Sequence, residues 1–201
     1  MHVIEKRDYY RISDDIYVSY QVVRRSDLKN SGPDHHFNLA PSFMMLPELF
    51  RLDIEAQSIL RTINEQNKEL GSFLHNLNQR ISALSRAIVA TEDDVADASR
   101  VKISEGGISF ITSELLSVST PLALKLLINC HSNEGGPLGL TCFGEVRHCR
   151  LREDGKGDHN DCITGVRFIN LDPVSQNLIS RHIIRRQAQA RRERLRHDRH
   201  S

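Results

Sequence analysis

Residues 47–89 read PELFRLDIEAQSILRTINEQNKELGSFLHNLNQRISALSRAIV, and apolar side chains recur through this stretch in one heptad phase. One apolar series repeats every seven residues and a second lies four residues after it, which is the 4-3 spacing of a coiled-coil seam. The pattern therefore predicts a long helix that packs along this seam. The seam positions are Leu49, Ala56, Leu60, Ile63, Asn67, Leu70, Leu74, Leu77, Ile81, Leu84 and Ile88.

The heptad phase passes through Gly71 unshifted, so we expect one continuous helix. Its start is expected at Pro47, because proline suits a first helical turn. A helical hairpin that turns at Gly71 and Ser72 is an alternative, since glycine costs about 1 kcal/mol relative to alanine inside a helix. A third arrangement is a long helix that folds onto the core of its own domain.

The width of the apolar stripe indicates how many helices meet at the seam. Apolar residues beside the seam make the stripe wider than a two-stranded coiled coil would bury. Asn67 is a polar seam residue, and such residues typically fix helix register and strand number. We therefore predict a homo-oligomer and favour a tetramer. The residues beside the seam are Leu52, Ile59, Phe73 and Ala87.

Composition and length exclude several classes of protein. A chain of 201 residues suits one elaborated domain or two small ones. No apolar run approaches the roughly 20 residues of a membrane helix, and the first residues lack the apolar centre of a signal peptide. We expect a cytoplasmic protein without membrane insertion. No phosphate-binding loop, metal-ligand cluster or nucleophile with a base stands at a recognisable spacing, so we expect neither an enzyme nor a cofactor.

Short β-type segments lie on both sides of the heptad stretch. Residues 13–15, SDD, predict a turn before the first strand, and Asp154-Gly155 predicts a hairpin turn between the last two. Six strands suffice to close a small antiparallel barrel. The predicted strands are residues 16–23, 100–104, 107–112, 121–130, 138–152 and 161–169.

The cysteines and the adjacent histidines do not predict a metal site. Four cysteines lie in apolar segments without C-x-x-C spacing, so we expect buried reduced thiols, and a disulfide only in an oxidising compartment. His35 and His36 have no third ligand at a useful spacing. The cysteines are Cys130, Cys142, Cys149 and Cys162.

The C-terminal segment is basic. Asp172-Pro173 predicts the start of a helix with an apolar face made by Val174, Leu178, Ile179, Ile183 and Ile184. Residues 173–201 contain eight arginines and two acidic residues, a local charge of +6, whereas the whole chain carries +1 and the remainder therefore −5. The segment is typical of a solvated helix end, but it also suits nucleic acid, anionic lipid or an acidic protein partner.

Two motifs resemble those of the PilZ domain family. Residues 5–12, EKRDYYRI, are similar to its R-x-x-x-R start, and residues 103–110, ISEGGISF, are similar to its D/N-x-S-x-x-G segment. Residues 165–168, GVRF, followed by an amphipathic helix, resemble the end of the domain. The resemblance covers about residues 3–24 and 99–186.

The resemblance implies a six-stranded β-barrel that receives the bacterial second messenger cyclic di-GMP and passes the signal on by protein contact, without catalysis. Arg7 and Arg11 match the arginine pair, whose guanidinium groups suit phosphate and guanine edges. Ser104 matches the serine that meets the guanine, and Gly107 matches the glycine that lets the backbone approach the ligand. The alternative for the two arginines is an ordinary solvated surface.

Lys102 departs from the family pattern, which has Asp or Asn at this position. An ammonium group has no acceptor for the guanine N–H groups, although it can attract phosphate. Losing such an acceptor costs about 1 to 3 kcal/mol, so the sequence predicts that cyclic di-GMP binding is weak or lost.

The heptad helix is a second departure, because it is inserted between the first strand and the Ser104 segment. We interpret it as the device that assembles the oligomer. The predicted domains are a discontinuous barrel (1–24 and 99–172), a linker (25–46), the inserted helix (47–98) and the basic C-terminal helix (173–201). The predicted function is an oligomeric PilZ-like adaptor with an unidentified protein partner. The alternatives are a structural assembly protein without a nucleotide ligand and a nucleic-acid-binding protein that uses the arginine-rich C-terminus.

Overall fold

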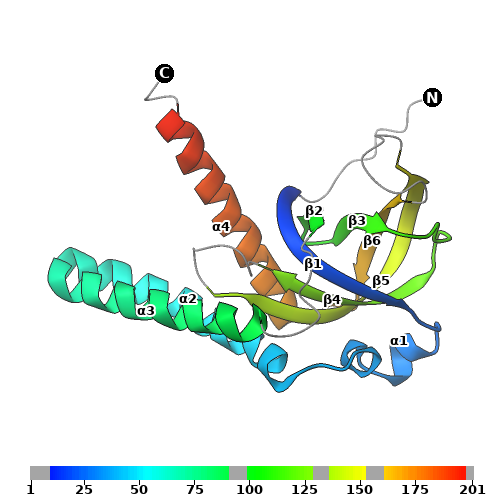
Figure 1. Ribbon diagram of the computed structural model, residues 1–201, viewed down its shortest axis with the longest axis horizontal. Helices are drawn as coiled ribbons and strands as arrows, with labels where there is room; N and C mark the ends of the chain where they lie inside the picture. Colours follow the sequence, from blue (N-terminus) through cyan, green and yellow to red (C-terminus); the bar gives the residue numbers. More distant parts are fainter. Residues whose placement is uncertain (1–9, 91–98, 129–135, 153–160, 198–201) are drawn as a thin grey trace. The chain divides into compact units, whose positions relative to one another are not determined.

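The computed structural model describes residues 10–90, 99–128, 136–152 and 161–197 (Figure 1). These residues form a barrel of β-strands, a long helical insertion and a C-terminal helix. Their elements in chain order are β1 (Ile12–Val22), α1 (Asp27–Asn30), the 3-10 helix η1 (Pro33–His36), α2 (Pro41–Gln66), α3 (Lys68–Ala90), β2 (Ser99–Ser104), β3 (Gly107–Thr112), β4 (Pro121–Ile128), β5 (Leu138–Leu151), β6 (Cys162–Ile169) and α4 (Pro173–His197).

The six strands close into a barrel in the order β1-β2-β3-β6-β5-β4, which confirms the predicted six-stranded antiparallel barrel. Closure leaves no strand edge unpaired, so the barrel needs no further strand to cover it. By packing, the chain separates into two compact units. One comprises Met1–Asp14, Arg100–Thr120 and Gly144–Ser201, and the other comprises Asp15–Ser99 and Pro121–Phe143. The predicted turn at residues 154–155 lies outside the described residues.

In the first unit, strands β2, β3 and β6 alternate between core and surface. Ile103, Ile108, Phe110 and Val166 are buried, whereas the residues between them on β3 and β6 are small or exposed. The register pairs Ser104 with Gly107 across β2 and β3, and Ser109 with Gly165 across β3 and β6. This alternation is the pattern of a sheet with one buried face.

Helix α4 begins where the sequence predicted. The Asp172 carboxylate accepts hydrogen bonds from the backbone N–H groups of Val174 (2.9 Å) and Ser175 (3.0 Å), which makes Asp172 the N-cap. Burial opposes ionisation of Asp172, but these bonds prevail and lower its pKa. Of the predicted apolar face, Leu178, Ile179 and Ile183 are buried, whereas Val174 and Ile184 are exposed.

A buried polar cluster joins α4 to β1. His182 Nε2 lies 2.7 Å from Asp14 Oδ2, and Arg186 Nη2 lies 2.9 Å from Asp14 Oδ1. Asp14 belongs to β1, so the predicted turn at residues 13–15 is wrong. Residues of α4 supply hydrogen-bond and ion-pair partners for the Asp14 carboxylate. These partners offset the cost of burying the charge, so the strand can continue through Asp14.

In the second unit, β1 pairs with β4, and the N-terminal part of α2 and the C-terminal end of α3 pack on β4. The register runs from Ile16 opposite Ile128 to Val22 opposite Leu122. Phe43 and Leu46 of α2, Val89 of α3 and Leu127 of β4 form a buried cluster, against which Tyr17 and Leu39 pack. The Lys125 ammonium lies 5.1 Å from the centre of the Phe43 ring, a cation–π contact.

The heptad stretch folds into a hairpin of two helices that lie side by side (Figure 1), so the expectation of one continuous helix is wrong. The chain turns at Asn67, four residues before the Gly71-Ser72 turn that was the alternative. Asn67 has an extended backbone, and its N–H donates to the Ile63 carbonyl at 2.7 Å. Its side-chain Oδ1 accepts from the Leu70 N–H at 3.0 Å. Asn67 therefore ends α2 and caps α3, a role for which its short amide suits it.

Gly71 permits the two helices to approach closely beside the turn. A Cβ atom at this position would lie 2.7 Å from Asn64 Cα, closer than any real side chain allows. The glycine that was expected to weaken a single helix is thus required by the hairpin.

The segment predicted to be a linker, residues 25–46, is largely helical. It contains α1, η1 and the start of α2, which begins at Pro41 and leaves Pro47 inside the helix. The same first-turn preference of proline applies, but at Pro41. Thr141 donates a 2.6 Å hydrogen bond to Asp34, and the His36 ring meets Phe143 edge-on at 5.8 Å between ring centres. These contacts fix the segment onto β5.

Helices long and apolar enough to cross a membrane are absent from the described part of the chain. The same residues contain no cluster of three or more side chains that suits a metal ion. Among them, Cys142 and Cys162 are buried thiols as predicted, whereas Cys149 is only half-buried, and none of the three forms a disulfide. Cys130 lies outside the described residues. Burial, and then the neighbouring Cys149, raises the pKa of the Cys162 thiol.

Candidate functional site

The hairpin between β2 and β3 carries the serine and the glycine of the PilZ-like motif. Ser104 is buried, and its hydroxyl donates to the Gly107 carbonyl at 3.2 Å. The Phe168 N–H donates to the Gly106 carbonyl at 3.0 Å, which ties the hairpin to β6. The Ser104 hydroxyl thus supports the hairpin itself, and its oxygen retains acceptor capacity for a ligand.

Gly107 is required by its neighbour across the sheet. A Cβ atom at Gly107 would lie 2.2 Å from the Val166 carbonyl oxygen, so no other residue fits without moving β6. The sequence assigned this glycine to close backbone approach toward a ligand. In the structure, Gly107 is needed for packing within the barrel. A role in ligand binding would be in addition to this packing role.

Lys102 lies two residues before Ser104 on β2, so both side chains belong to the same face of the strand. It is exposed and stands opposite Ser109 of β3. It makes no hydrogen bond or ion pair with the part of the chain that the structure describes. The ammonium is therefore available beside the serine of the motif, where the family pattern has an acceptor.

Of the two motif arginines, only one lies among the described residues. Arg11 is exposed and immediately precedes β1, whereas Arg7 lies outside the described residues. Because Arg7 lies outside the described residues, the joint role of Arg7 and Arg11 with Ser104 and Gly107 stays a prediction.

Charged residues that the sequence reasoning missed lie on the neighbouring strands. Arg167 stands opposite Gly107 on β6, and its Nη2 lies 3.7 Å from Glu145 Oε1 of β5. Arg147 Nη1 lies 3.4 Å from the same carboxylate oxygen. One carboxylate thus faces two guanidinium groups, which leaves this face with a positive excess. The alternation of residues 165–168, GVRF, would have placed Arg167 on the outer face.

His148 also belongs to this face. A Cβ atom at Gly165 would lie 2.1 Å from His148 Cε1, so the imidazole covers the glycine. Because Gly165 stands opposite Ser109, the covered glycine and Lys102 occupy one row across the sheet. The outer face of β2, β3 and β6 therefore combines small residues with cationic side chains, a surface that suits anions.

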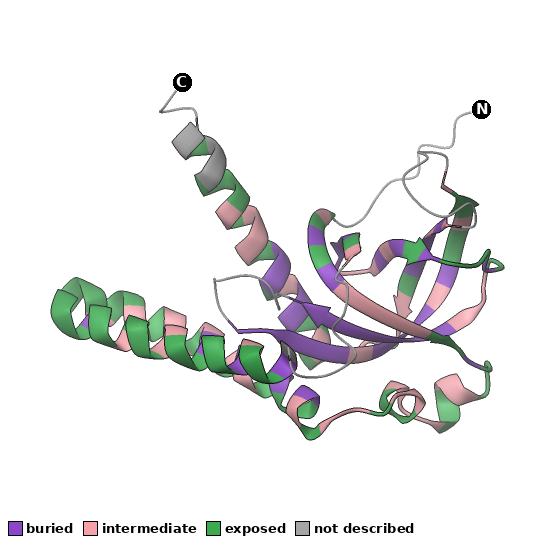
Figure 2. Ribbon diagram, in the orientation of Figure 1, coloured by how far each residue is buried: buried purple, intermediate pink, exposed green. Residues whose placement is uncertain are grey.

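The second candidate site is the helical hairpin, which carries the predicted seam. On α2, the seam residues Leu49, Ala56, Leu60 and Ile63 are half-buried. On α3, Leu74 is half-buried, and the other apolar seam residues are exposed to solvent (Figure 2). These exposed residues are Leu70, Leu77, Ile81, Leu84 and Ile88. The polar seam residue, Asn67, forms the turn and not an interhelical contact.

A different set of α3 residues is buried within the hairpin. Gly71, Ser82 and Ser85 are buried, and Asn78 Nδ2 donates a 2.7 Å hydrogen bond to Asp53 Oδ1 of α2. Gln57 donates to the other Asp53 oxygen at 3.0 Å. In the described ranges, no buried side-chain nitrogen or oxygen lacks a hydrogen-bond partner. Small and polar residues that the heptad pattern did not select therefore form part of the contact between the two helices.

The six strands form a small closed barrel, and the helical hairpin is inserted between β1 and β2. A sequence model of the PilZ domain family matches residues 77–185, more than half of the chain. The chain belongs to the PilZ domain family.

Two solved structures are similar to this chain. One is a Xanthomonas campestris protein described as a new tetrameric PilZ domain self-assembled via an unusual helical bundle, with 15% identity, a TM-score of 0.49, and coverage of 92% of this chain and 89% of that one. The other is the PilZ domain of YcgR from Escherichia coli with cyclic di-GMP, with 18% identity, a TM-score of 0.33, and coverage of 49% and 81%. No curated protein matched the chain. The family assignment rests on the sequence model alone.

Proposed function

We propose that this protein is a non-enzymatic PilZ adaptor that assembles through its helical insertion and binds cyclic di-GMP weakly or not at all. Its output is contact with a protein partner. The cytoplasmic location stays a prediction.

The position of Lys102 is the main support for the proposal that cyclic di-GMP binds weakly or not at all. It lies on the same face of β2 as Ser104, and it is exposed. A guanine edge offers N–H donors, which need an oxygen acceptor and meet an ammonium donor here. Arg167 and Arg147 already supply cations on this face, so Lys102 adds attraction for phosphate that is largely redundant.

Calorimetric titration of cyclic di-GMP into the wild type and into Lys102→Asp tests this proposal. We expect the aspartate variant to bind about tenfold to a hundredfold more tightly, because one recovered acceptor contributes about 1 to 3 kcal/mol. Arg7→Ala and Arg11→Ala, each combined with Lys102→Asp, are the controls for site identity and should abolish the gain. Submicromolar binding by the wild type, or weaker binding by the aspartate variant, would contradict the proposal.

The arginine-rich C-terminus supports nucleic-acid binding less well than the sequence alone suggested. Arg186 pairs with the buried Asp14 and also donates to Gln189 at 2.7 Å, so this arginine serves the fold. Retention on a DNA or RNA column that falls steeply with salt would favour the nucleic-acid alternative.

A further inference from the structure

Helix α3 presents a continuous apolar stripe to solvent, which we call the outer stripe. Its residues are between 44% and 65% exposed, although all are large and apolar. Such a stripe over most of the length of a helix is a large exposed apolar surface, of the kind that marks an interaction site. The outer stripe consists of Leu70, Phe73, Leu77, Ile81, Leu84 and Ile88.

Helix α3 turns its polar face, not its apolar face, toward α2. The face of α3 toward α2 contains Gly71, Asn78, Ser82 and Ser85, and the Asn78–Asp53 hydrogen bond crosses between the helices. An amphipathic helix ordinarily turns its apolar stripe to the core. Because α2 takes the small and polar face, the apolar face is left for something else.

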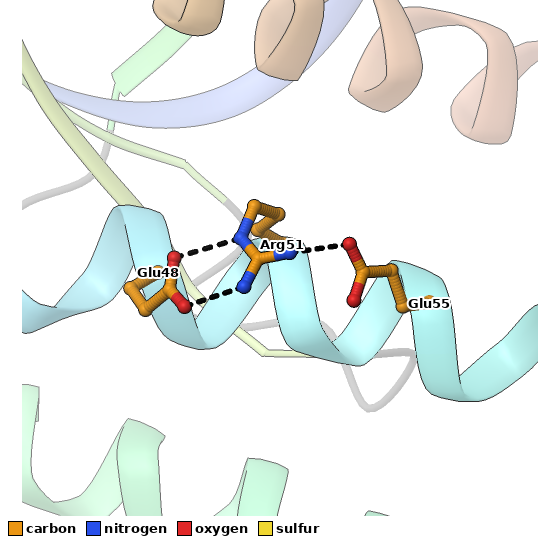
Figure 3. Close-up of polar contacts among 3 residues, drawn as sticks. All are labelled: Glu48, Arg51 and Glu55. Atoms are coloured by element: carbon orange, nitrogen blue, oxygen red, sulfur yellow. Dashed lines mark hydrogen bonds and ion pairs between the residues drawn. The ribbon is translucent and has the colours of Figure 1, made fainter.

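Helix α2 differs, since its exposed side carries charges. Arg51 Nε donates to Glu48 at 2.8 Å, and the same guanidinium contacts Glu55, as Figure 3 shows. The hydrogen bonds with Arg51 lower the pKa of Glu48, and the pairing with Glu48 raises the pKa of Arg51. An ion-paired, exposed array of this kind is typical of a solvated helix face. Leu52 and Ile59 are exposed on α2 as well, but they stand among charged residues.

The outer stripe offers enough area for a specific interface. With roughly 100 Å² open on each of its six side chains, a symmetric pair would bury on the order of 1,200 Å² in total. That value reaches the lower limit of stable protein–protein interfaces. A contact of this size needs a partner with a matching stripe along its whole length.

We infer that the occupant of the outer stripe is the same stripe on a second copy of this chain. Ile81 and Ile88 stand in one seam series and Leu77 and Leu84 in the other, an arrangement that packs well between paired helices. A second copy supplies the same 4-3 spacing, so each stripe is complementary to itself. This inference rests on the proposed function, because it assigns the assembly to one face of one helix.

The test compares two double variants that carry the same charge change at equally exposed positions. Leu77→Glu with Leu84→Glu alters residues that are 44% and 65% exposed on α3. Leu52→Glu with Ile59→Glu alters residues that are 46% and 60% exposed on α2. Light scattering on the full chain at tens of micromolar gives the mass of each. Circular dichroism verifies that helix and strand are retained, and Leu77→Gln with Leu84→Gln replaces the charged α3 pair if helix is lost.

We expect the wild type to have a multiple of the single-chain mass of 22.9 kDa, and the α3 variant to fall to 22.9 kDa. The α2 variant should keep the wild-type mass. An oligomeric wild type with an unchanged α3 variant would overturn this inference while leaving the proposed assembly intact. Dissociation of the α2 variant would overturn the assignment to α3 alone. A monomeric wild type would refute the proposed assembly itself.

Discussion

Strand β3 buries apolar residues in the core of its own chain, whereas helix α3 exposes most of its large apolar residues to solvent. In β3, Ile108 and Phe110 are buried in the barrel, and Ser109 between them is only half-buried. In α3, Ser82 and Ser85 are buried, and Leu77 and Leu84 face solvent. The strand satisfies its sequence pattern within one chain. The helix does not satisfy its pattern within the single chain, which supports the proposed contact with a second copy.

The largest effect on stability is expected to distinguish the buried apolar residues of the barrel from the exposed apolar residues of α3. Phe110→Ala should lower the free energy of unfolding by about 3 to 5 kcal/mol, because it opens a cavity in the barrel core. Phe73→Ala, the matched control on the outer stripe, should leave the dilute protein unchanged within about 0.5 kcal/mol. Urea unfolding at low protein concentration measures both. Equal losses would show that Phe73 is buried in the single chain and that the comparison fails.

The N-cap of α4 gives the next effect. Asp172→Ala should destabilise the protein by about 1 kcal/mol, since the first-turn N–H groups lose their acceptor. Asp172→Asn keeps a capping oxygen and removes only the charge. Because the folded pKa of Asp172 lies below its usual 3.8, its charge stabilises the fold above that pH and ceases to do so as pH falls through the folded pKa.

The difference in melting temperature between wild type and Asp172→Asn should therefore shrink below about pH 4. A constant difference from pH 7 to pH 3 would show that the charge of Asp172 plays no part in capping.

Asn67→Leu sharpens the comparison at the turn of the hairpin. The change removes the cap of α3, at about 1 kcal/mol, and completes the apolar seam, which offsets part of that loss. We expect a shift from hairpin toward a longer helix, visible as a larger hydrodynamic radius at unchanged mass per chain. Asn76→Leu, at an exposed position nine residues later on α3, is the control. An unchanged radius for Asn67→Leu would mean that Gly71 alone sets the turn.

The smallest effect is expected at the charged face of α2. Arg51→Gln removes the contacts to Glu48 and Glu55, and exposed pairs of this kind contribute little to stability. The melting temperature and the oligomer mass should match those of the wild type. A loss of the oligomer would place α2 in the interface.

The barrel was predictable because each strand carries its own signal. Alternation and turn residues placed all six strands to within a few residues, and Asp172-Pro173 marked the start of α4. Each of these patterns depends on neighbours in the sequence. The burial of Asp14 was not predictable, since its partners His182 and Arg186 lie on α4, far along the chain.

The hairpin shows where pattern reasoning stopped. The heptad phase continues through Asn67, but one residue with an extended backbone and two capping bonds turns the chain. Periodicity carries no information on such a cap, although asparagine is among the residues favoured at the N-cap of a helix. For the candidate ligand site, the predicted strand bounds put Ser104 at the end of one strand and Gly107 at the start of the next, whereas the positions of Arg167 and His148 depend on strand register.

The cluster of Asp14, His182 and Arg186 acts as an anchor for the chain that precedes β1. Arg11 lies three residues before this anchor, so its Cα atom stays within about 10 Å of Asp14 however the backbone turns. This short connection restricts the volume that the Arg11 guanidinium can explore. If Arg11 binds an anion, as the proposed site requires, less conformational entropy is lost on binding, and the anchor would preorganise that contact from a distance.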